Sequence, residues 1–411
     1  MRVLIYEQWQ GGHYYNYLEN IIPRVSQLVD EVIVTISGMA YESETFKKKF
    51  ESIMNLNNVT FQPILSEEDP SLPIKDRMKL LDNLYSIIKY NKPDYVMVPS
   101  ADSQNLAQGL LGLINFGRSP LNTPIEVTFH NGYGPDPKTI REKFKEVIYK
   151  LSYVGCTWDY MNFVNAHYFD DAKLKKRRWV TRACLIPDPV SEPKLMSRLQ
   201  ARSMLGIPLE GKYIGLLGSL DSRNNIPQFI KAFAKASLPH DHRLLLAGKC
   251  SNVYELLINS VYSDFIESKR IIFIDRFLTD DEVRDGYQAL DVCCIPRTNF
   301  PGLSSLALKS VASSRPLLVH DFGWSSYITK KFNLGHVCDM KSVESFADAI
   351  AYSLHNSDQF SLNLSAKKLL KFHSVENFSE HMIHRMVSHF DIPHEDKRLL
   401  WDSVRLSVDD G

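Results

Sequence analysis

The sequence predicts an α/β protein made of two doubly wound domains. Its 411 residues exceed the size of one ordinary core and indicate two domains. Short apolar or β-branched runs alternate with longer amphipathic stretches, which predicts parallel strands joined by helices, and this alternation occurs twice. Between the two series, IPDPVSEP holds three prolines in eight residues. Because it can continue neither a helix nor a central strand, residues 186–193 are predicted to be a linker.

The first series predicts the N-terminal domain, over residues 1–188. A first helix runs to about Val29, and a later helix covers Gln104 to Phe116. The predicted strands are RVLIY (2–6), EVIVTI (31–36), DYVMVP (94–99) and IEVTFH (125–130). In an open α/β sheet, ligands bind at the carboxyl ends of the strands. The loops that follow these strands are therefore candidate binding loops.

The second series predicts the C-terminal domain, over residues 189–375. Its predicted strands are YIGLLGS (213–219), RLLLAG (243–248), RIIFID (270–275), DVCCIP (291–296) and PLLVH (316–320). Its predicted helices cover 227–235, 253–263 and 280–289, and a further helix ends at Ser313. From 376 to 411, Phe378, Met382 and Met386 recur at helical spacing, which predicts C-terminal helices that pack back across the domains.

The composition argues against several functional classes. Lys and Arg (48) balance Asp and Glu (48), so no overall positive field favours a nucleic-acid partner, and the basic run KLKKRRW (173–179) is interpreted as solvated surface. The six cysteines show no CxxC spacing, which indicates reduced thiols in a cytoplasmic protein without a metal site. No window approaches the roughly 18 apolar residues of a membrane span. We therefore expect a cytoplasmic protein whose membrane contact, if it has any, is peripheral.

Three segments of the second series carry a resemblance to a known family. They are SLDSRNNIPQFIKAFA (219–234), LLLAGK (244–249) and the long run from LTDDEVRDGYQALD to PLLVHDFG (278–323). Together with the double βα series they resemble GT-B glycosyltransferases, and are most similar to glycosyltransferase family 4, also called group 1. The resemblance is strongest over about 212–350.

The resemblance implies both a fold and a reaction. The fold is two Rossmann-like domains that face a central cleft. The reaction moves a sugar from a UDP- or GDP-sugar to an acceptor hydroxyl, with retention at the anomeric carbon and without a metal or other cofactor. The C-terminal domain would hold the nucleotide sugar, and the N-terminal domain would hold a glycan, lipid-linked or protein-linked acceptor.

The segment PRTNFPGLSSLALKSVA (296–312) is the predicted phosphate-binding element. Gly302, Leu303, Ser304 and Ser305 lead into a helix, whose first backbone N–H groups can bind a diphosphate that approaches without obstruction by a Cβ. Arg297 can pair with phosphate oxygens in a bidentate manner. The alternative for the serines is an ordinary helix N-cap.

The sequence departs from the family pattern at two places. Pro301 and Lys309 stand where the resemblance would place two glutamates, so Lys309 either meets a phosphate or lies on the helix surface. Ser219 and Asn224 stand where an arginine and a lysine are usual, and Arg223 is the candidate to replace their charge. These departures support an alternative function, in which the protein is a catalytically degenerate GT-B subunit that binds a ligand or a partner.

Two polar residues follow strands of the N-terminal domain. His130 ends IEVTFH and resembles the family histidine that faces the donor sugar, so it is the first catalytic candidate; Gly132 and Gly134 favour an open loop after it. Asp102 follows DYVMVP and could act as a base or orient the acceptor hydroxyl. The alternatives are a structural histidine, and helix N-capping by Asp102 or Ser103.

The segment GGHYYN (11–16) is predicted to be the loop after the first strand. Gly11 and Gly12 would allow the backbone to approach the donor phosphates, and His13 and Tyr14 would line the acceptor side. The alternative is a plain turn.

The stretch TIREKFKEVIYKLSYVG (139–155) predicts a basic amphipathic helix. Lys143 and Lys150 accompany Phe144, Val147 and Leu151. The simpler interpretation is a surface helix whose apolar side lies in the core. The alternative is peripheral contact with an anionic membrane, where lipid-linked acceptors are found.

Overall fold

The computed structural model describes residues 1–9, 11–65, 74–114, 121–130, 140–250 and 262–406. The chain divides into two compact units, which are described separately. Unit 1 comprises Met1–Pro189 and Val375–Arg398, and unit 2 comprises Val190–Ser374 and Leu399–Gly411. The chain passes from the first unit to the second inside the proline-rich segment 186–193.

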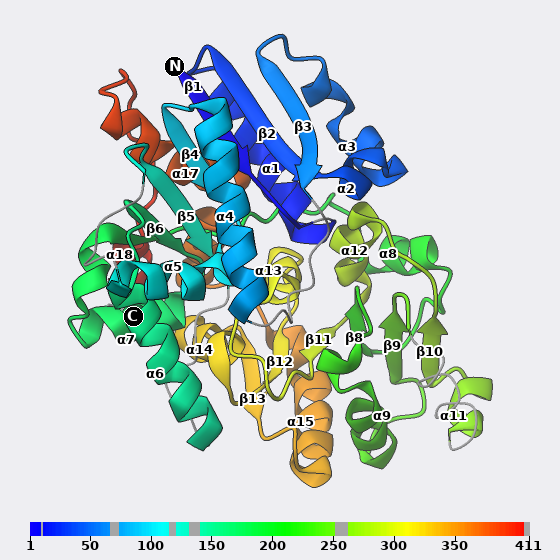
Figure 1. Ribbon diagram of the computed structural model, residues 1–411. Helices are drawn as coiled ribbons and strands as arrows, with labels where there is room; N and C mark the ends of the chain where they lie inside the picture. Colours follow the sequence, from blue (N-terminus) through cyan, green and yellow to red (C-terminus); the bar gives the residue numbers. More distant parts are fainter. Residues whose placement is uncertain (10, 66–73, 115–120, 131–139, 251–261, 407–411) are drawn as a thin grey trace. The chain divides into compact units, whose positions relative to one another are not determined.

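Unit 1 is built on a seven-stranded parallel sheet (Figure 1). Its strands are β1 (Arg2–Tyr6), β2 (Glu31–Ser37), β3 (Val59–Leu65), β4 (Tyr95–Val98), β5 (Ile125–Phe129), β6 (Tyr160–Phe163) and β7 (Ala183–Leu185). Their order in the sheet is β3-β2-β1-β4-β5-β6-β7. The chain order reverses between β1 and β4, and this switch point is where open α/β sheets bind ligands.

Helices connect and cover these strands. They are α1 (Gly12–Ser26), α2 (Gly38–Glu42), α3 (Glu44–Met54), α4 (Ile74–Asn91), α5 (Asp102–Ile114), α6 (Ile140–Gly155), α7 (Ala166–Leu174), the 3-10 helix η1 (Arg178–Arg182) and α17 (Val375–His389). The C-terminal helix α17 packs against α1, and α5 packs between α4 and α6.

Unit 2 contains a six-stranded parallel sheet. Its strands are β8 (Tyr213–Leu217), β9 (Arg243–Ala247), β10 (Ile271–Ile274), β11 (Val292–Ile295), β12 (Leu317–His320) and β13 (Gly335–Cys338). The order is β10-β9-β8-β11-β12-β13, so the switch point lies between β8 and β11. Two parallel sheets joined by helices confirm the predicted α/β fold class.

The helices of unit 2 surround this sheet (Figure 1). They are α8 (Arg198–Leu205), α9 (Ile226–Lys235), α11 (Ser263–Glu267), α12 (Asp280–Gly286), α13 (Ser305–Ala312), α14 (Gly323–Phe332), α15 (Val343–Asn356), α16 (Leu364–Phe372) and α18 (Trp401–Leu406). Short 3-10 turns are η2 (Ser222–Asn224), η3 (Tyr287–Ala289) and η4 (Ser357–Gln359). The helix predicted over 253–263 lies almost wholly outside the described residues.

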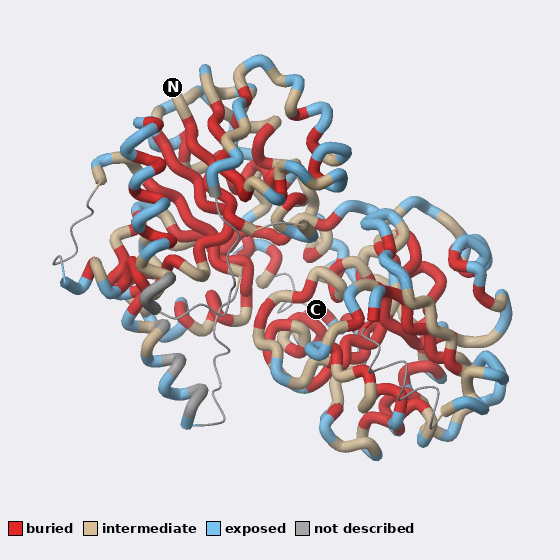
Figure 2. The backbone as a smooth tube through the Cα atoms, turned by 45° about the vertical axis from the view of Figure 1, so that its right-hand side comes forward, coloured by how far each residue is buried: buried red, intermediate tan, exposed pale blue. Residues whose placement is uncertain are grey.

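The core of each unit is its sheet, and Figure 2 shows the strands as mainly buried segments. Every residue of β4, β5, β8 and β11 is buried or nearly so, because helices cover both faces of a parallel sheet. In unit 2, Phe229 of α9 stacks on Phe346 of α15 at 5.4 Å over the buried side chains of β8 and β9. All six cysteines are free thiols, and Cys156, Cys250, Cys293 and Cys294 are buried.

The segment GGHYYN is not a loop beyond its first residue. Gly11 is the N-cap, and α1 begins at Gly12, so the predicted loop over 11–16 is wrong from Gly12 onward. Both glycines have positive φ, +75° and +49°, while a Cβ at either would meet nothing within 4 Å. The pair is therefore explained by backbone conformation, since only glycine adopts two such angles in succession without strain.

Candidate functional site

Each unit carries a group of predicted residues at the carboxyl ends of its strands. In unit 2 the first group lies in the loop that follows β8. Ser219 donates to Asp221 (3.0 Å), and Arg223 binds the same carboxylate through its backbone N–H and its guanidinium (2.6 Å from Nη2). Burial raises the pKa of Asp221, but the bonds from Arg223 outweigh it and lower the pKa overall. The charge of Arg223 is thus balanced inside its own loop.

Asn224 and Arg297 connect this loop to the loop after β11. The Nε of Arg297 donates to Oδ1 of Asn224 (2.7 Å), and Asn224 donates to the carbonyl oxygen of Ser219 (2.5 Å). The guanidinium also lies 5.1 Å from the ring centre of Phe300. Burial lowers the pKa of Arg297, and the nearby charge of Arg223 lowers it further. The structure therefore brings together three predicted donor residues, Ser219 and Arg223 of the loop after β8 and Arg297 of the loop after β11, which lie more than 70 positions apart.

Ser304 lies at the start of α13 with its hydroxyl unused. It occupies the N-cap position, but its side chain makes no capping hydrogen bond. Ser304 is 2% exposed, and its Oγ has no hydrogen-bond partner among the described residues. An ordinary N-cap serine bonds to a backbone N–H of the first turn, so Ser304 has the N-cap position of the alternative without its hydrogen bond. Gly302 is buried before it, Leu303 is half-buried, and Ser305 is the first residue of the helix.

Pro301 lies in the loop before α13, and Lys309 lies within that helix. The carbonyl oxygen of Pro301 accepts from the backbone N–H of Trp324 (3.1 Å), and a Cβ on Gly323 would lie only 2.7 Å from the Cα of Pro301. Gly323 has a φ of +70°, so the loop at 301 packs directly on the first turn of α14. Lys309 is half-buried in the last turn of α13, where its positive charge suits the helix dipole.

In unit 1 the structure brings His130 and Asp102 together. The Oδ2 of Asp102, the first residue of α5, accepts from the backbone N–H of His130 (2.9 Å). The Nε2 of His130 lies 2.8 Å from the carbonyl oxygen of Pro99. A carbonyl can only accept, so Nε2 carries a hydrogen and Nδ1 is the acceptor of the neutral ring. Gly132 and Gly134 lie outside the described residues.

Aromatic side chains of α1 surround the ring of His130. Its ring centre lies 5.1 Å from that of His13, 6.2 Å from that of Tyr14 and 4.9 Å from that of Tyr17. His13 is exposed and Tyr14 is half-buried, whereas Tyr17 is buried and donates to Asp188 (2.9 Å). Burial raises the pKa of Tyr17, and the carboxylates of Asp188 and Asp102 raise it further.

Two buried acids near this group escaped the sequence analysis. Asp188 belongs to the linker segment IPDPVSEP. Its position between two prolines was the only feature of the sequence that could have singled it out. Glu7 follows β1 and accepts from Ser100 (2.7 Å) and from the backbone N–H of Trp9 (2.9 Å). Burial raises the pKa of Glu7 to about 8.

The predicted basic helix is α6, and part of its apolar side faces outward. Phe144 is 66% exposed, and Val147 and Leu151 are also exposed. The interpretation that this side lies in the core is therefore wrong for these three residues. A close crossing joins α6 to α5, because a Cβ on Gly155 would meet the backbone of Gly109 at 2.4 Å and the side chain of Leu113 at 2.6 Å.

Within the described ranges, no helix combines the length and apolar character needed to cross a bilayer. In the same part of the chain, no three His, Cys, Asp or Glu side chains are grouped so that they could hold a metal ion.

Comparison with known proteins gives a family for the segment that contains the unit 2 group. Residues 211–356 match the family model for glycosyl transferases, group 1. The predicted resemblance to group 1 glycosyltransferases is thereby confirmed for this segment, which includes the loops after β8 and β11. The narrower similarity to family 4 stays a prediction. A search among curated protein sequences gives no significant match.

Solved structures extend the structural likeness to almost the whole chain. Sucrose-phosphate synthase from Thermosynechococcus elongatus has a TM-score of 0.68 at 14% identity, over 96% of this chain and 100% of that one. HepE of Anabaena, in complex with UDP and glucose, has a TM-score of 0.62 at 12% identity, over 94% and 100%. MnaA of S. aureus, with UDP, gives 0.62 at 12%, over 97% and 99%. At these identities the likeness establishes the fold, which is GT-B.

Proposed function

We propose that the protein transfers a sugar from a nucleotide sugar to an acceptor hydroxyl, with unit 2 holding the donor. The observation that carries this proposal is the buried hydroxyl of Ser304, which lacks a partner at the N-terminus of α13. A buried hydroxyl without a partner loses a hydrogen bond it would make in water, and a phosphate oxygen restores it. The structures of HepE and MnaA hold UDP, which favours a UDP-sugar over a GDP-sugar.

The chemical step needs stabilisation of the leaving diphosphate. The bond between the anomeric carbon and the phosphate oxygen breaks, and a bond to the acceptor oxygen forms. The acceptor loses its proton, and the nucleoside diphosphate leaves with the electron pair. The N–H groups of α13, the hydroxyl of Ser304 and the guanidinium of Arg297 are assigned to that developing charge. Gly302, Leu303 and Ser305 shape the loop, and Gly12, Ser219, Arg223 and Lys309 are further proposed donor contacts.

The acceptor side is assigned to the group around His130 in unit 1. Its Nδ1 is the acceptor of the neutral ring, so it can take a proton or a hydrogen bond from a sugar hydroxyl. Asp102 holds the backbone of His130, which assigns it chiefly to positioning. His13 and Tyr14 add a ring surface of the kind that packs against sugars. The proposal includes retention at the anomeric carbon, which is inferred from the family resemblance. It also includes an acceptor that is a glycan, lipid-linked or protein-linked.

Calorimetric titration with UDP, GDP and UDP-glucose tests the donor site. Ser304→Ala removes the hydroxyl, and the matched control is Ser313→Ala, at the other end of α13, whose hydroxyl is also buried and without a partner. A hydrogen bond to a charged group contributes about 1.5–3 kcal/mol, so Ser304→Ala is expected to weaken UDP binding about tenfold or more. The control should bind UDP as the wild type does. Equal affinities for all three proteins would overturn the assignment.

The alternative is a degenerate subunit that binds a nucleotide sugar without turnover. It is supported by Pro301 and Lys309, which stand where the family resemblance would place two glutamates. The whole segment 296–305, PRTNFPGLSS, contains no carboxylate. Release of UDP from UDP-glucose, with water or a glycan as acceptor, separates the two proposals. UDP binding without any release over many hours would favour the degenerate subunit.

We also propose that unit 1 contacts an anionic membrane from the cytoplasm through α5 and α6. The exposed apolar residues of α6 form a stripe along one side of the helix. Exposed apolar residues of α5 lie beside the C-terminal end of α6. They are Ile140, Phe144, Val147, Leu151 and Val154 of α6, and Leu110, Leu113 and Ile114 of α5. Exposed apolar patches of this kind mark interaction surfaces. The exposed Lys143 adds charge complementary to anionic lipid. The free cysteines agree with a reducing cytoplasm.

Co-sedimentation with vesicles tests this contact. The full chain should bind vesicles that contain phosphatidylglycerol and should not bind pure phosphatidylcholine. Phe144→Ser should reduce binding, whereas Phe277→Ser, a similarly exposed phenylalanine of unit 2, should leave it unchanged. Two outcomes would contradict the membrane contact and point to another partner for this surface. Either neither variant loses vesicle binding, or the protein forms a concentration-dependent dimer that Phe144→Ser abolishes.

A further inference from the structure

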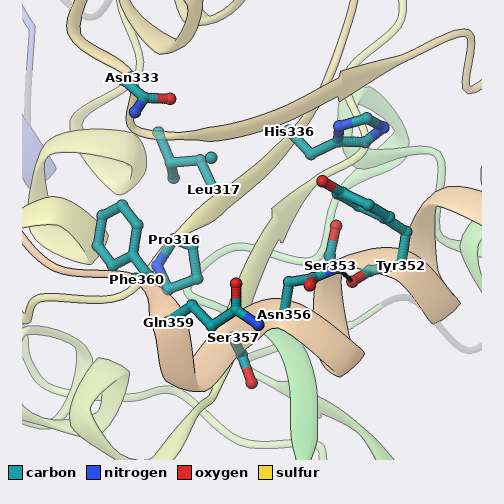
Figure 3. A pocket seen from close by; sticks show the side chains of 11 residues that line it. Pro316, Leu317, Asn333, His336, Tyr352, Ser353, Asn356, Ser357, Gln359 and Phe360 are labelled. Atoms are coloured by element: carbon teal, nitrogen blue, oxygen red, sulfur yellow. Dashed lines mark hydrogen bonds between the residues drawn. The ribbon is translucent and has the colours of Figure 1, made fainter.

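A cavity of about 240 Å³ lies in unit 2, away from the loops assigned to the donor. Leu317 begins β12 and Gly335 begins β13, so the cavity opens at the amino ends of these strands, opposite the end that carries Arg297 and Ser304. The carboxyl half of α15 and the turn η4 complete it. Figure 3 shows the side chains that line it.

The polar groups of this cavity are all uncharged. Three carboxamides, those of Asn333, Asn356 and Gln359, line it together with the hydroxyls of Ser353 and Ser357. A carboxamide offers donors and an acceptor on one side chain, which suits a ligand whose hydroxyls both donate and accept. A lining without a cation gives no compensation for a phosphate or a carboxylate, so a neutral ligand is favoured.

Ser353 has a buried hydroxyl that lacks a partner. Its side chain is 8% exposed, and Oγ makes no hydrogen bond in the described part of the chain. The neighbouring Ser357, by contrast, receives a bond from Lys212 (3.2 Å) and donates to the carbonyl oxygen of Leu354 (2.9 Å). Within one cavity wall, one hydroxyl is thus satisfied by the protein and the other is left for a bound group.

An aromatic pair forms the outer wall. The rings of Tyr352 and His336 lie 5.0 Å apart at 44°, and Figure 3 shows them together on one side of the cavity, with Ser353 beside Tyr352. Tyr352 is 58% exposed. Burial lowers the pKa of His336, which favours the neutral form of its ring. The face of such a ring packs against the C–H groups of a sugar, while the edge groups bind its hydroxyls.

We propose that this cavity is a second carbohydrate site, which holds one neutral sugar ring of a glycan. Its volume lies below the roughly 300–1,000 Å³ of pockets for drug-sized ligands and fits a small ring. Tyr352 supplies the stacking surface, Ser353 and the carboxamides bind hydroxyls, and Phe360 with Pro316 forms the apolar wall across from Tyr352. The binding itself is independent of the proposed transfer, and only the role of retaining a glycan near the enzyme rests on it.

Saturation-transfer NMR with neutral sugars tests the site on the full chain. The probes are glucose, galactose, N-acetylglucosamine and their neutral disaccharides, with uridine as a planar control and glucose 6-phosphate as a charged one. Excess UDP is present throughout to occupy the proposed donor site. At least one neutral sugar should receive saturation at millimolar concentration, and neither control compound should do so.

Three variants locate the signal. Tyr352→Ala should weaken sugar binding about tenfold, by loss of the stacking surface, and Ser353→Ala should weaken it by a smaller factor. Tyr90→Ala removes a similarly exposed tyrosine from unit 1 and should change nothing. Circular dichroism establishes that each variant is folded. Tyr352 is largely exposed, so its removal leaves the core intact.

The outcomes separate this proposal from the donor site. No saturation of any neutral sugar, or binding that Tyr352→Ala leaves unchanged, would overturn the second site. A signal from uridine or glucose 6-phosphate that Tyr352→Ala abolishes would overturn its specificity for neutral sugars. Titration of UDP against Tyr352→Ala and Ser304→Ala reports the donor site alone: failure of UDP to bind, with sugar binding retained, would reject only the proposed transfer.

Discussion

The buried carboxyl of Glu7 is expected to make the stability of unit 1 depend on pH. It is 1% exposed, and among the described residues its hydrogen-bond donors are neutral: the hydroxyl of Ser100 and the backbone of Gln8 and Trp9. Burial raises the pKa of Glu7 from 4.5 to about 8, against the opposing effect of those bonds. Glu7→Gln is the chosen change, because an amide of the same shape cannot ionise. Its oxygen can accept from the backbone N–H of Trp9, and its NH2 group can donate to the hydroxyl of Ser100, which reverses the direction of that bond.

The sign and size follow from linkage between proton binding and folding. The folded state binds the proton more tightly than the unfolded state, so the stabilisation is complete below about pH 4.5 and is lost as the pH rises to about 8. The difference between the two pKa values corresponds to about 5 kcal/mol at most, at about 1.36 kcal/mol per pKa unit. From pH 5 to 8, Glu7→Gln should therefore gain on the wild type by up to about 1.4 kcal/mol per pH unit.

Urea unfolding at pH 5.5, 6.5 and 7.5, followed by circular dichroism, measures this gain. The matched control is Glu126→Gln. Burial raises the pKa of Glu126 to about 7, but Asn162 (2.6 Å) and Tyr95 (2.8 Å) donate to its carboxyl group and Arg385 lies near. Its pH-dependent gain should be smaller than that of Glu7→Gln. Free energies of the wild type and Glu7→Gln that run parallel across this pH range would refute the reasoning.

Three further substitutions have expected outcomes. Gly12→Ala places a Cβ at a φ of +49° in open space, so it should cost about 1–2 kcal/mol in urea unfolding from backbone strain alone, and an unchanged midpoint would contradict this. Arg202→Ala removes a guanidinium that donates to the buried Asp291 (2.8 Å), whose other oxygen stays paired with Arg198 (2.6 Å), and should destabilise unit 2 by about 1.5–3 kcal/mol in the same assay. Asp221→Asn releases Arg223 from an exposed ion pair worth about 0.2–1 kcal/mol, so calorimetry should find UDP bound up to about fivefold more tightly, and weaker binding would count against a role for Arg223.

Strands buried on both faces were predictable because they are continuous apolar runs. YIGLLGS contains β8, and DVCCIP contains β11, each within two residues of its observed ends. Three edge strands, β3, β7 and β13, and the interior strand β6 were missed, whereas the edge strand β10 was predicted as RIIFID. β3 carries Pro63, which disfavours a central strand but is tolerated at an edge, and β7 has only three residues. These strands lack a continuous apolar run, so their formation depends on pairing with neighbouring strands rather than on a local sequence pattern.

The same distinction applies to the candidate site in unit 1. His130 was found because it ends the predicted strand IEVTFH and resembles a family histidine, and Asp102 because it lies in the loop after DYVMVP. Ligands of open sheets gather at such strand ends. The bond between Tyr17 and Asp188 joins residues 171 positions apart, and no local pattern encodes it. Glu7 was missed for a related reason, since a glutamate after a strand predicts exposure, and its burial depends on Ser100 from the next strand of the sheet.

The charges around the proposed donor site indicate how it would recognise a diphosphate. Arg223 is paired with Asp221, and the half-buried Arg297 is held by Asn224 and Phe300. Little unbalanced positive charge remains to attract a nucleotide from a distance. Affinity would then depend on preorganised hydrogen bonds from Ser304 and the first turn of α13, and these require the correct geometry rather than net charge. The absence of basic residues from the loop after β8 would then weaken the long-range attraction of a nucleotide but leave the hydrogen bonds that recognise its diphosphate. For this reason the titration of Ser304→Ala tests the proposed function more directly than the number of missing charges does.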